Sequence, residues 1–163
     1  RVLFRLVNKL VKGIKKAIDA IDSNVVFGIS PAGNIDSLNS KYSYYVNIKK
    51  WTNSTNFVDY IAPQIYWGFS HKTAKFDKMV DRWSSMVDQS KVKLYIGLPA
   101  YKMGQPSNGT TSAEKKELKS KTLLKKMAKY VNKKNADGII VFDYADLDKT
   151  ACKKLAKYLK KTY

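Results

Sequence analysis

Two spacings of hydrophobic residues alternate along the chain. In four segments apolar side chains recur every three or four positions, which predicts amphipathic helices. These segments are residues 2–21, 73–87, 114–134 and 148–158. Between them lie short runs that are apolar almost throughout, which predicts strands buried on both faces. These runs are residues 24–30, the strand within 57–67, 91–99 and 136–144. The tyrosine-rich stretch 41–51 predicts a further helix or helical turn.

Helices and apolar strands that alternate in this way predict an α/β fold with a parallel sheet covered by helices. Four such βα units are half of a (β/α)8 TIM barrel, and no low-complexity linker divides residues 1–163, so we assign one domain. An open half barrel leaves strand edges and apolar side chains uncovered. Either a preceding half or a second copy must cover them. We expect the preceding half, because the chain opens with a helix that lacks its strand.

The segment 58–68, V-D-Y-I-A-P-Q-I-Y-W-G, is the most informative stretch. It ends in Gln64, Tyr66 and Trp67, where a buried strand normally ends in turn residues. Aromatic faces stack on the C–H groups of sugars, while amides and phenols hydrogen-bond their hydroxyls, so the segment suits a carbohydrate. The chain has no His/Cys cluster, glycine-rich phosphate loop or zinc spacing, and the lone Cys152 forms no internal disulfide. No metal or organic cofactor is implied.

The net charge of +18 adds a second set of partners. Most lysines of residues 115–134 and 153–161 alternate with leucines at helical spacing, which is typical of solvated helix faces. Three interpretations remain: a solubilising surface, an acidic wall polymer or nucleic acid. A specific nucleic-acid interface is the least favoured, because there is no arginine-rich recognition helix and no zinc-finger pattern. No apolar run approaches the ~18–20 residues that cross a bilayer.

Three motifs carry a family resemblance. They are Gly28-Ile29-Ser30-Pro31 with Gly33, the 58–68 segment, and K-L-Y-I-G-L-P-A-Y-K-M at 93–103. Together they resemble the glycosyl-hydrolase-like family 10, whose members are bacterial and mostly exported. The resemblance implies strands five to eight of a (β/α)8 barrel, with the N-terminal half as partner. It also implies an extracellular or cell-envelope location and a polysaccharide substrate, for which peptidoglycan glycan strands are one candidate.

A more distant similarity links the chain to family 18 chitinases. Gly97-Leu98-Pro99-Ala100-Tyr101 is similar to a G-x-P-x-Y strand of those enzymes, and residues 59–66 are similar to a second strand. In their last strand a tryptophan forms the floor of a sugar subsite, and Phe142 takes that position here. Two departures from the nearer family are Ala32, where an aromatic is common, and Asp143, where a serine is common. They leave sugar preference open.

Side-chain alternation assigns the site residues. If Gln64 points into the barrel, the inward set near the carboxyl ends of the strands is Gln64, Tyr66, Tyr101, Phe142 and Tyr144. Functional groups of parallel barrels gather at those ends. Trp67 and Lys102 are expected at the rim. The alternatives are that the aromatics only fill the barrel and that Lys102 is an ordinary solvated lysine.

Glycoside hydrolysis usually requires two carboxyl groups. Asp143 is the remaining catalytic candidate here, although its parity is opposite to that of Phe142. We therefore expect the principal acids on the preceding half, with this segment positioning the substrate. The predicted function is a glycosidase acting on a cell-wall or amino-sugar polysaccharide once the barrel is complete. The alternative is a non-catalytic carbohydrate- or cell-wall-binding domain.

Overall fold

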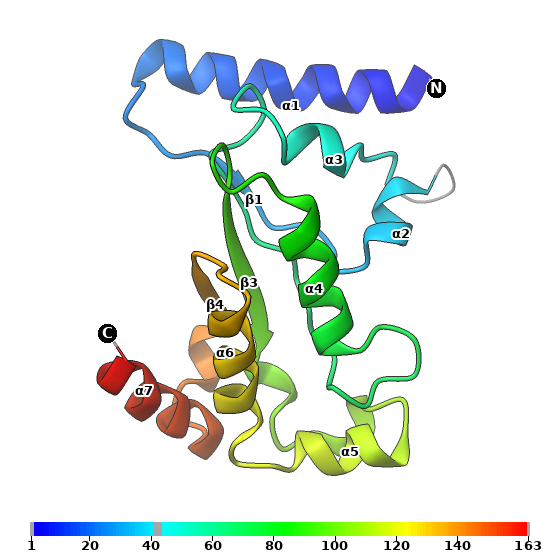
Figure 1. Ribbon diagram of the computed structural model, residues 1–163, viewed down its shortest axis with the longest axis vertical. Helices are drawn as coiled ribbons and strands as arrows, with labels where there is room; N and C mark the ends of the chain where they lie inside the picture. The colour runs from blue at the N-terminus through cyan, green and yellow to red at the C-terminus, as the bar shows by residue number, and fades with distance from the viewer. Residues whose placement is uncertain (1, 41–43, 163) are drawn as a thin grey trace.

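The computed structural model describes residues 2–40 and 44–162. In this part of the chain seven α-helices alternate with four strands (Figure 1). The helices are α1 (Val2–Ile21), α2 (Ile35–Asn39), α3 (Ile48–Trp51), α4 (Phe76–Met86), α5 (Ser112–Leu118), α6 (Leu123–Lys133) and α7 (Thr150–Thr162). The strands are β1 (Gly28–Ile29), β2 (Tyr60–Ile61), β3 (Lys93–Pro99) and β4 (Gly138–Phe142). Short 3-10 turns follow β3 and β4 at Ala100–Lys102 and Tyr144–Asp146, and a third spans Pro106–Asn108.

The four strands form one parallel sheet in the order β1-β2-β3-β4. The backbone ladder extends beyond the short strands: Ala62 N–H donates to the Ile29 carbonyl and Gln64 N–H to the Pro31 carbonyl, both at 2.9 Å. Gln64 also bridges to Gly97 of β3. The sequential parallel order confirms the predicted α/β sheet. The chain proceeds along the long axis from α1 to α7 as an open series of units (Figure 1).

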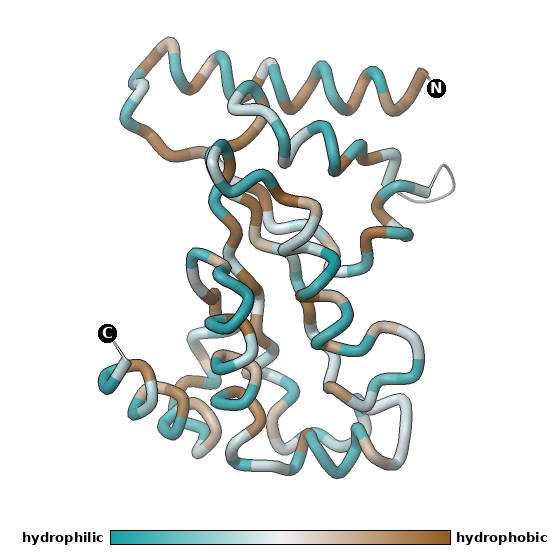
Figure 2. The backbone as a smooth tube through the Cα atoms, in the orientation of Figure 1, coloured by the Kyte–Doolittle hydropathy of each residue, from teal (hydrophilic) through white to brown (hydrophobic). Residues whose placement is uncertain are grey.

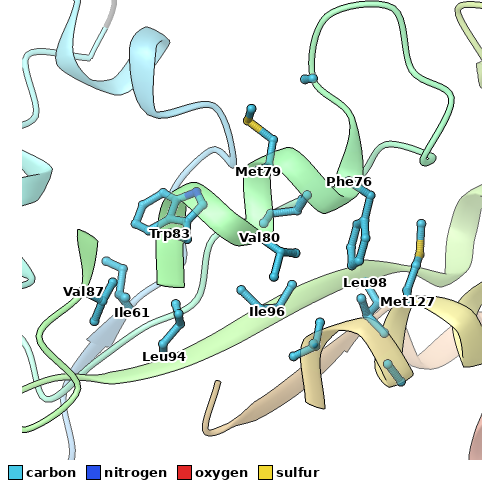
Figure 3. Packing of buried hydrophobic residues seen from close by; sticks show 14 of the residues in the cluster. Ile61, Phe76, Met79, Val80, Trp83, Val87, Leu94, Ile96, Leu98 and Met127 are labelled. Atoms are coloured by element: carbon cyan, nitrogen blue, oxygen red, sulfur yellow. The ribbon is translucent and has the colours of Figure 1, made fainter. Parts of the chain in front are cut away.

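Helices cover one face of the sheet, most completely over β2 and β3. Leu94, Ile96 and Leu98 alternate along β3 and are completely buried, as is Ile61 of β2. Figure 3 shows these side chains against Trp83 and Val80 of α4. The Trp83 indole N–H donates to the Gly33 carbonyl at 2.7 Å, which also ties α4 to the loop after β1. This face is the hydrophobic core.

The opposite face alternates large and small side chains from one strand to the next. At the amino end of the strands the Tyr60 and Tyr95 rings meet edge to face, with centroids 5.5 Å apart. Glycines flank them: a Cβ at Gly28 would lie 2.2 Å from the Tyr60 ring, and one at Gly138 would lie 3.1 Å from Tyr95. No helix covers this face on β4, where Ile140 is 42% exposed.

Helix α1 lies across one end of the molecule and is anchored by a buried lysine (Figure 1). The Lys15 ammonium pairs with Asp19 at 2.5 Å and with Asp59 at 3.1 Å, and Asp59 accepts the Phe27 N–H at 2.8 Å. These carboxylates raise the pKa of Lys15 against the effect of burial. Along the helix, apolar and polar positions alternate (Figure 2). Its uncovered apolar stripe comprises Leu3, Leu6, Leu10, Ile14 and Ile21.

Two predicted helices are wrong in extent. The segment 114–134 is two helices, α5 and α6, because Gly104 N–H donates to the Leu118 carbonyl at 2.8 Å and ends α5 there. Ser120 then caps the next turn, with its hydroxyl accepting the Thr122 N–H at 3.3 Å. In the 41–51 stretch, helix α3 occupies Ile48–Trp51, while residues 41–43 lie outside the described residues. The short helix α2, capped by Asn34, was not predicted.

Candidate functional site

Three aromatic side chains from three neighbouring strands meet at the carboxyl end of the sheet. Tyr66 follows β2, Tyr101 follows β3 and Phe142 ends β4. The Tyr66 ring stacks on Phe142 at 5.8 Å and 19°, and Tyr101 meets both rings edge to face, at 5.7 Å from Tyr66 and 5.9 Å from Phe142. The aromatic cluster therefore means Tyr66, Tyr101 and Phe142. It brings together three of the seven residues predicted to bind substrate.

The aromatic cluster is packed on one side and open on the other. A Cβ at Gly97 would lie 3.1 Å from the Tyr66 ring, so this glycine provides the space into which Tyr66 folds. Tyr66 and Tyr101 are half-buried, and burial raises the pKa of both phenols, with Tyr101 adding to the effect on Tyr66. Both therefore remain protonated donors near neutral pH. Phe142 is 48% exposed and offers an apolar ring face.

Gln64 lies two residues before Tyr66, and one of its two polar side-chain atoms is hydrogen-bonded within the protein. Its amide nitrogen donates to the Ser30 carbonyl at 3.1 Å and approaches the Ser30 hydroxyl at 3.4 Å. That hydroxyl in turn donates to the Ala62 carbonyl at 2.8 Å. The amide oxygen of Gln64 makes no hydrogen bond to any described residue. It is therefore the acceptor of the amide that remains available to a hydroxyl.

Lys102 is not an ordinary solvated lysine. Its ammonium donates to the Tyr66 carbonyl at 2.7 Å and lies 6.0 Å from the Tyr101 ring centroid. Burial lowers the pKa of Lys102, and the nearby Glu114 carboxylate opposes that effect. Trp67 is half-buried as well: its ring is 5.7 Å from that of His71, and a Cβ at Gly33 would lie 3.0 Å from it.

Two carboxylates that sequence reasoning missed hold the loop after Trp67. Glu114, which is 1% exposed, accepts the Gly68 N–H at 2.7 Å, the Thr110 N–H at 2.7 Å and the Thr110 hydroxyl at 2.8 Å. Glu117 accepts the hydroxyl and the N–H of Ser70, at 2.8 and 3.1 Å. Burial, the largest single influence, raises the pKa of Glu114. The hydrogen bonds from Thr110 and Gly68, with a smaller contribution from His71, together outweigh it and hold that pKa below its ordinary value.

The peptide segment around Trp67 is thus held on both sides. Lys102 binds the carbonyl before Trp67, and Glu114 binds the N–H after it. His71 completes the loop, with Nδ1 accepting the Ala74 N–H at 2.9 Å. A signal for Glu114 was present in the sequence, because Thr111 and Glu114 have the spacing of an N-terminal capping box. The Thr111 hydroxyl does accept the Glu114 N–H, at 2.9 Å, but the Glu114 carboxylate bonds Gly68 and Thr110.

The end of β4 carries the remaining two predicted residues. Tyr144 is 87% exposed and forms no ring contact within residues 2–40 and 44–162, so it does not join the aromatic cluster. Asp143 is half-buried, and its buried Oδ1 has no hydrogen-bond partner among the described residues. An unpartnered buried carboxylate oxygen costs free energy and calls for a donor from elsewhere. Groups of three or more His, Cys, Asp or Glu that could hold a metal are absent from the described residues.

Comparison with known proteins identifies the family. The family description glycosyl hydrolase-like 10 matches residues 5–114. The chain belongs to the glycosyl hydrolase-like 10 family. The resemblance in the strand motifs is thereby confirmed, and the family match includes Gln64, Tyr66, Trp67, Tyr101 and Lys102. Asp143 and the rest of the β4 end lie beyond it.

Individual members of the glycosyl hydrolase-like 10 family extend the similarity. Glycosyl hydrolase DigH of Escherichia coli O6:H1 is 30% identical over 171 residues, which cover 93% of this chain and 37% of DigH. DigH of E. coli K12 is 35% identical over 111 residues, covering 61% of this chain and 25% of the relative. Glycosyl hydrolase YngK of Bacillus subtilis is 37% identical over 116 residues, covering 60% of this chain and 21% of YngK. The chain therefore spans about a third or less of these relatives.

No described helix combines the length and the apolar character required to cross a membrane. The relatives are named glycosyl hydrolases, a term for enzymes whose substrates are carbohydrates. The aromatic cluster and the free oxygen of Gln64 are the groups that match such a substrate chemically. Rings offer faces to C–H groups, and the phenols and the amide offer hydrogen bonds to hydroxyls.

Proposed function

We propose that this chain is the C-terminal half of a (β/α)8 glycosidase barrel, supplying strands five to eight and the substrate-positioning side of the cleft. The observation that carries the proposal is the aromatic cluster of Tyr66, Tyr101 and Phe142 at the carboxyl end of a parallel, sequentially ordered sheet. Ligands of parallel barrels bind at that end. The substrate class is a cell-wall or amino-sugar polysaccharide, peptidoglycan glycan strands included, met outside the cytoplasm.

The half barrel is supported by what remains uncovered at its two ends. At one end, α1 presents the stripe that includes Leu3, Leu10 and Ile21, and at the other, β4 presents Ile140 and Phe142. Edge strands and exposed apolar stripes of this kind are normally covered by a neighbouring element. Four preceding βα units would cover both, because closing a barrel places its first strand against β4 and its fourth strand against α1.

In this arrangement each residue has a distinct role. Phe142 supplies the floor on which a sugar ring stacks, and the Tyr66 and Tyr101 phenols donate to its hydroxyls. The Gln64 amide oxygen accepts a hydroxyl deeper in the barrel. Lys102 and Glu114 fix the backbone on both sides of Trp67. The catalytic acids belong to the preceding half of the barrel. A hydrogen-bond donor from that half, or a bound water, pairs with the buried Oδ1 of Asp143.

Binding of an N-acetylglucosamine hexamer tests the sugar-stacking role. We expect Phe142→Ala and Tyr66→Ala to weaken binding by about 10-fold each, the equivalent of ~1.4 kcal/mol. Tyr44→Ala is the matched control, because Tyr44 is 55% exposed and precedes α3, a helix that contributes no residue to the aromatic cluster. Isothermal titration calorimetry measures the affinities of the three variants and of the unmodified protein. Equal affinities of all three variants and the unmodified protein would reject the aromatic cluster as a sugar subsite.

A second candidate, a carbohydrate-binding domain without activity, is favoured by one observation. Of the described Asp and Glu residues, only Asp143 adjoins a member of the aromatic cluster in sequence, next to Phe142. Reducing-end release from purified glycan strands separates the two functions. We expect release by the protein that contains the preceding half, and a reduction of about 10-fold or more in its Gln64→Ala variant. Binding without any release would establish the non-catalytic domain instead, and unchanged release by Gln64→Ala would reject the role of Gln64.

A further inference from the structure

Helices α6 and α7 pack side by side on the helix-covered side of the sheet (Figure 1). A groove is lined by residues of both helices. The groove has a volume of about 340 Å³. Its lining residues are Thr122, Lys125, Lys154, Lys157, Tyr158 and Lys161. Because Leu124 and Met127 of α6 are buried in the core, the lysines of this helix project away from the sheet. The groove and the aromatic cluster therefore lie on opposite sides of the sheet.

The groove lysines have no charged partners. Lys125, Lys154, Lys157 and Lys161 form none of the ion pairs found among the described residues. Helix α6 contains four lysines and α7 five, and neither helix contains an Asp or Glu. The nearest comparison is within the same chain: α4 and α5 each carry both acidic and basic residues.

A helix that carries lysines and no acidic residues is destabilised by repulsion between them, and solubility does not require that arrangement. Lysines at i and i+4, such as Lys153 with Lys157 and Lys157 with Lys161, repel each other and destabilise the helix. A surface that only promotes solubility intersperses both signs. The repulsion is relieved when an anionic ligand lies in the groove, so a ligand accounts for the pattern where solvation does not.

We infer that the α6–α7 groove binds a flexible polymer with one phosphodiester per repeat, at a site separate from the sugar subsite. Lysine is a compact point charge with three rotatable donors, whereas arginine presents a rigid planar fork. Four ammonium groups around one groove suit the tetrahedral oxygens of a phosphodiester, which accept from several directions. The Thr122 and Tyr158 hydroxyls supply further donors. Tyr158 is the only aromatic ring in the lining, so the groove lacks the series of rings on which nucleic-acid bases stack.

Fluorescence anisotropy with labelled poly(glycerol phosphate) tests the inference. The groove variant carries Lys125→Gln, Lys154→Gln, Lys157→Gln and Lys161→Gln. The control variant carries the same change of charge on exposed lysines elsewhere, as Lys12→Gln, Lys16→Gln, Lys72→Gln and Lys75→Gln. At about 50 mM salt we expect the groove variant to bind at least ~10-fold more weakly and the control less than ~3-fold more weakly. The slope of log Kd against log salt falls by about 2–3 in the groove variant alone.

Each other outcome overturns the inference. An equal loss of affinity in the two variants would show that the polymer is attracted by net charge alone. If the unmodified protein does not bind the polymer, the proposed ligand is wrong. Tighter binding of an oligothymidylate with the same number of phosphates would identify a nucleic-acid surface instead. Misfolding is checked by thermal unfolding, in which removal of like-charge repulsion leaves the Tm of the groove variant unchanged or raised. Phe142→Ala leaves polymer binding unchanged, so this test is independent of the glycosidase proposal.

Discussion

The two faces of the parallel sheet are built from the same strands but in different ways. On the helix-covered face, Ile96 is completely buried among side chains of α4 and α6 (Figure 3). On the opposite face, Ile140 of the neighbouring strand is 42% exposed, and the aromatic cluster replaces aliphatic packing. Over β2 and β3 the first face is completely buried by elements of this chain. The second face has the mixture of rings, an amide oxygen and uncovered apolar area that a ligand and a further protein segment would share.

The largest expected effect comes from two isoleucines on adjacent strands. Ile96→Ala removes fully buried atoms and leaves a cavity, so we expect a loss of about 2–5 kcal/mol in the free energy of unfolding. Ile140→Ala is the matched control and should cost less than about 1 kcal/mol, since much of that side chain is already in water. Urea denaturation measures both. Losses of similar size would mean that the open face is packed as a core in solution.

An intermediate effect is expected at the loop after Trp67, which Glu114 holds through the Gly68 N–H. Glu114→Gln keeps the shape of the side chain but turns an N–H₂ group towards donors, so we expect a loss of about 1–3 kcal/mol. Glu117→Gln, which changes a half-buried carboxylate, should lose less. Because the folded state holds the pKa of Glu114 below 4.5, its stabilisation is present above about pH 4.5 and fades as the pH falls through the lowered value.

The difference in unfolding free energy between the unmodified protein and Glu114→Gln should therefore shrink at acidic pH. Urea denaturation at a series of pH values from neutral to about pH 3 measures this. A difference that stays constant over that range would show that the Glu114 carboxylate is not stabilised by the Gly68 and Thr110 donors.

The smallest of the three effects tests whether the open face is packed at the amino end of the strands. A Cβ at Gly28 would lie 2.2 Å from the Tyr60 ring, so Gly28→Ala should cost about 1–2 kcal/mol as the ring is displaced. In a Tyr60→Ala background the same change should cost little, which a double-mutant cycle detects in thermal unfolding. Additive losses would place the Tyr60 ring away from Gly28 and extend the open region to both ends of this face.

Much of the site could be predicted because strands impose a period of two on their side chains. The parity of Phe142 on β4, and of Tyr66 two residues after the bridged Gln64, places both on one face of the sheet. Tyr101 joins them from the 3-10 turn after β3, so strand alternation alone does not explain its position. Tyr144 has the right parity but lies in a 3-10 turn beyond β4, where strand alternation no longer holds. Lys102 lies in the corresponding turn after β3, and the Tyr66 carbonyl holds its ammonium.

The sequence by itself determined the order and type of the main elements, because helical and strand periods are local and core residues are apolar wherever the chain is buried. It also determined the family, through short strand motifs. Only the tertiary structure decided where the predicted 114–134 helix breaks, because Gly104 binds the carbonyl that ends α5. It also decided the roles of Glu114 and Lys102, since a charged side chain can be solvated or buried, and its partners come from segments distant in sequence.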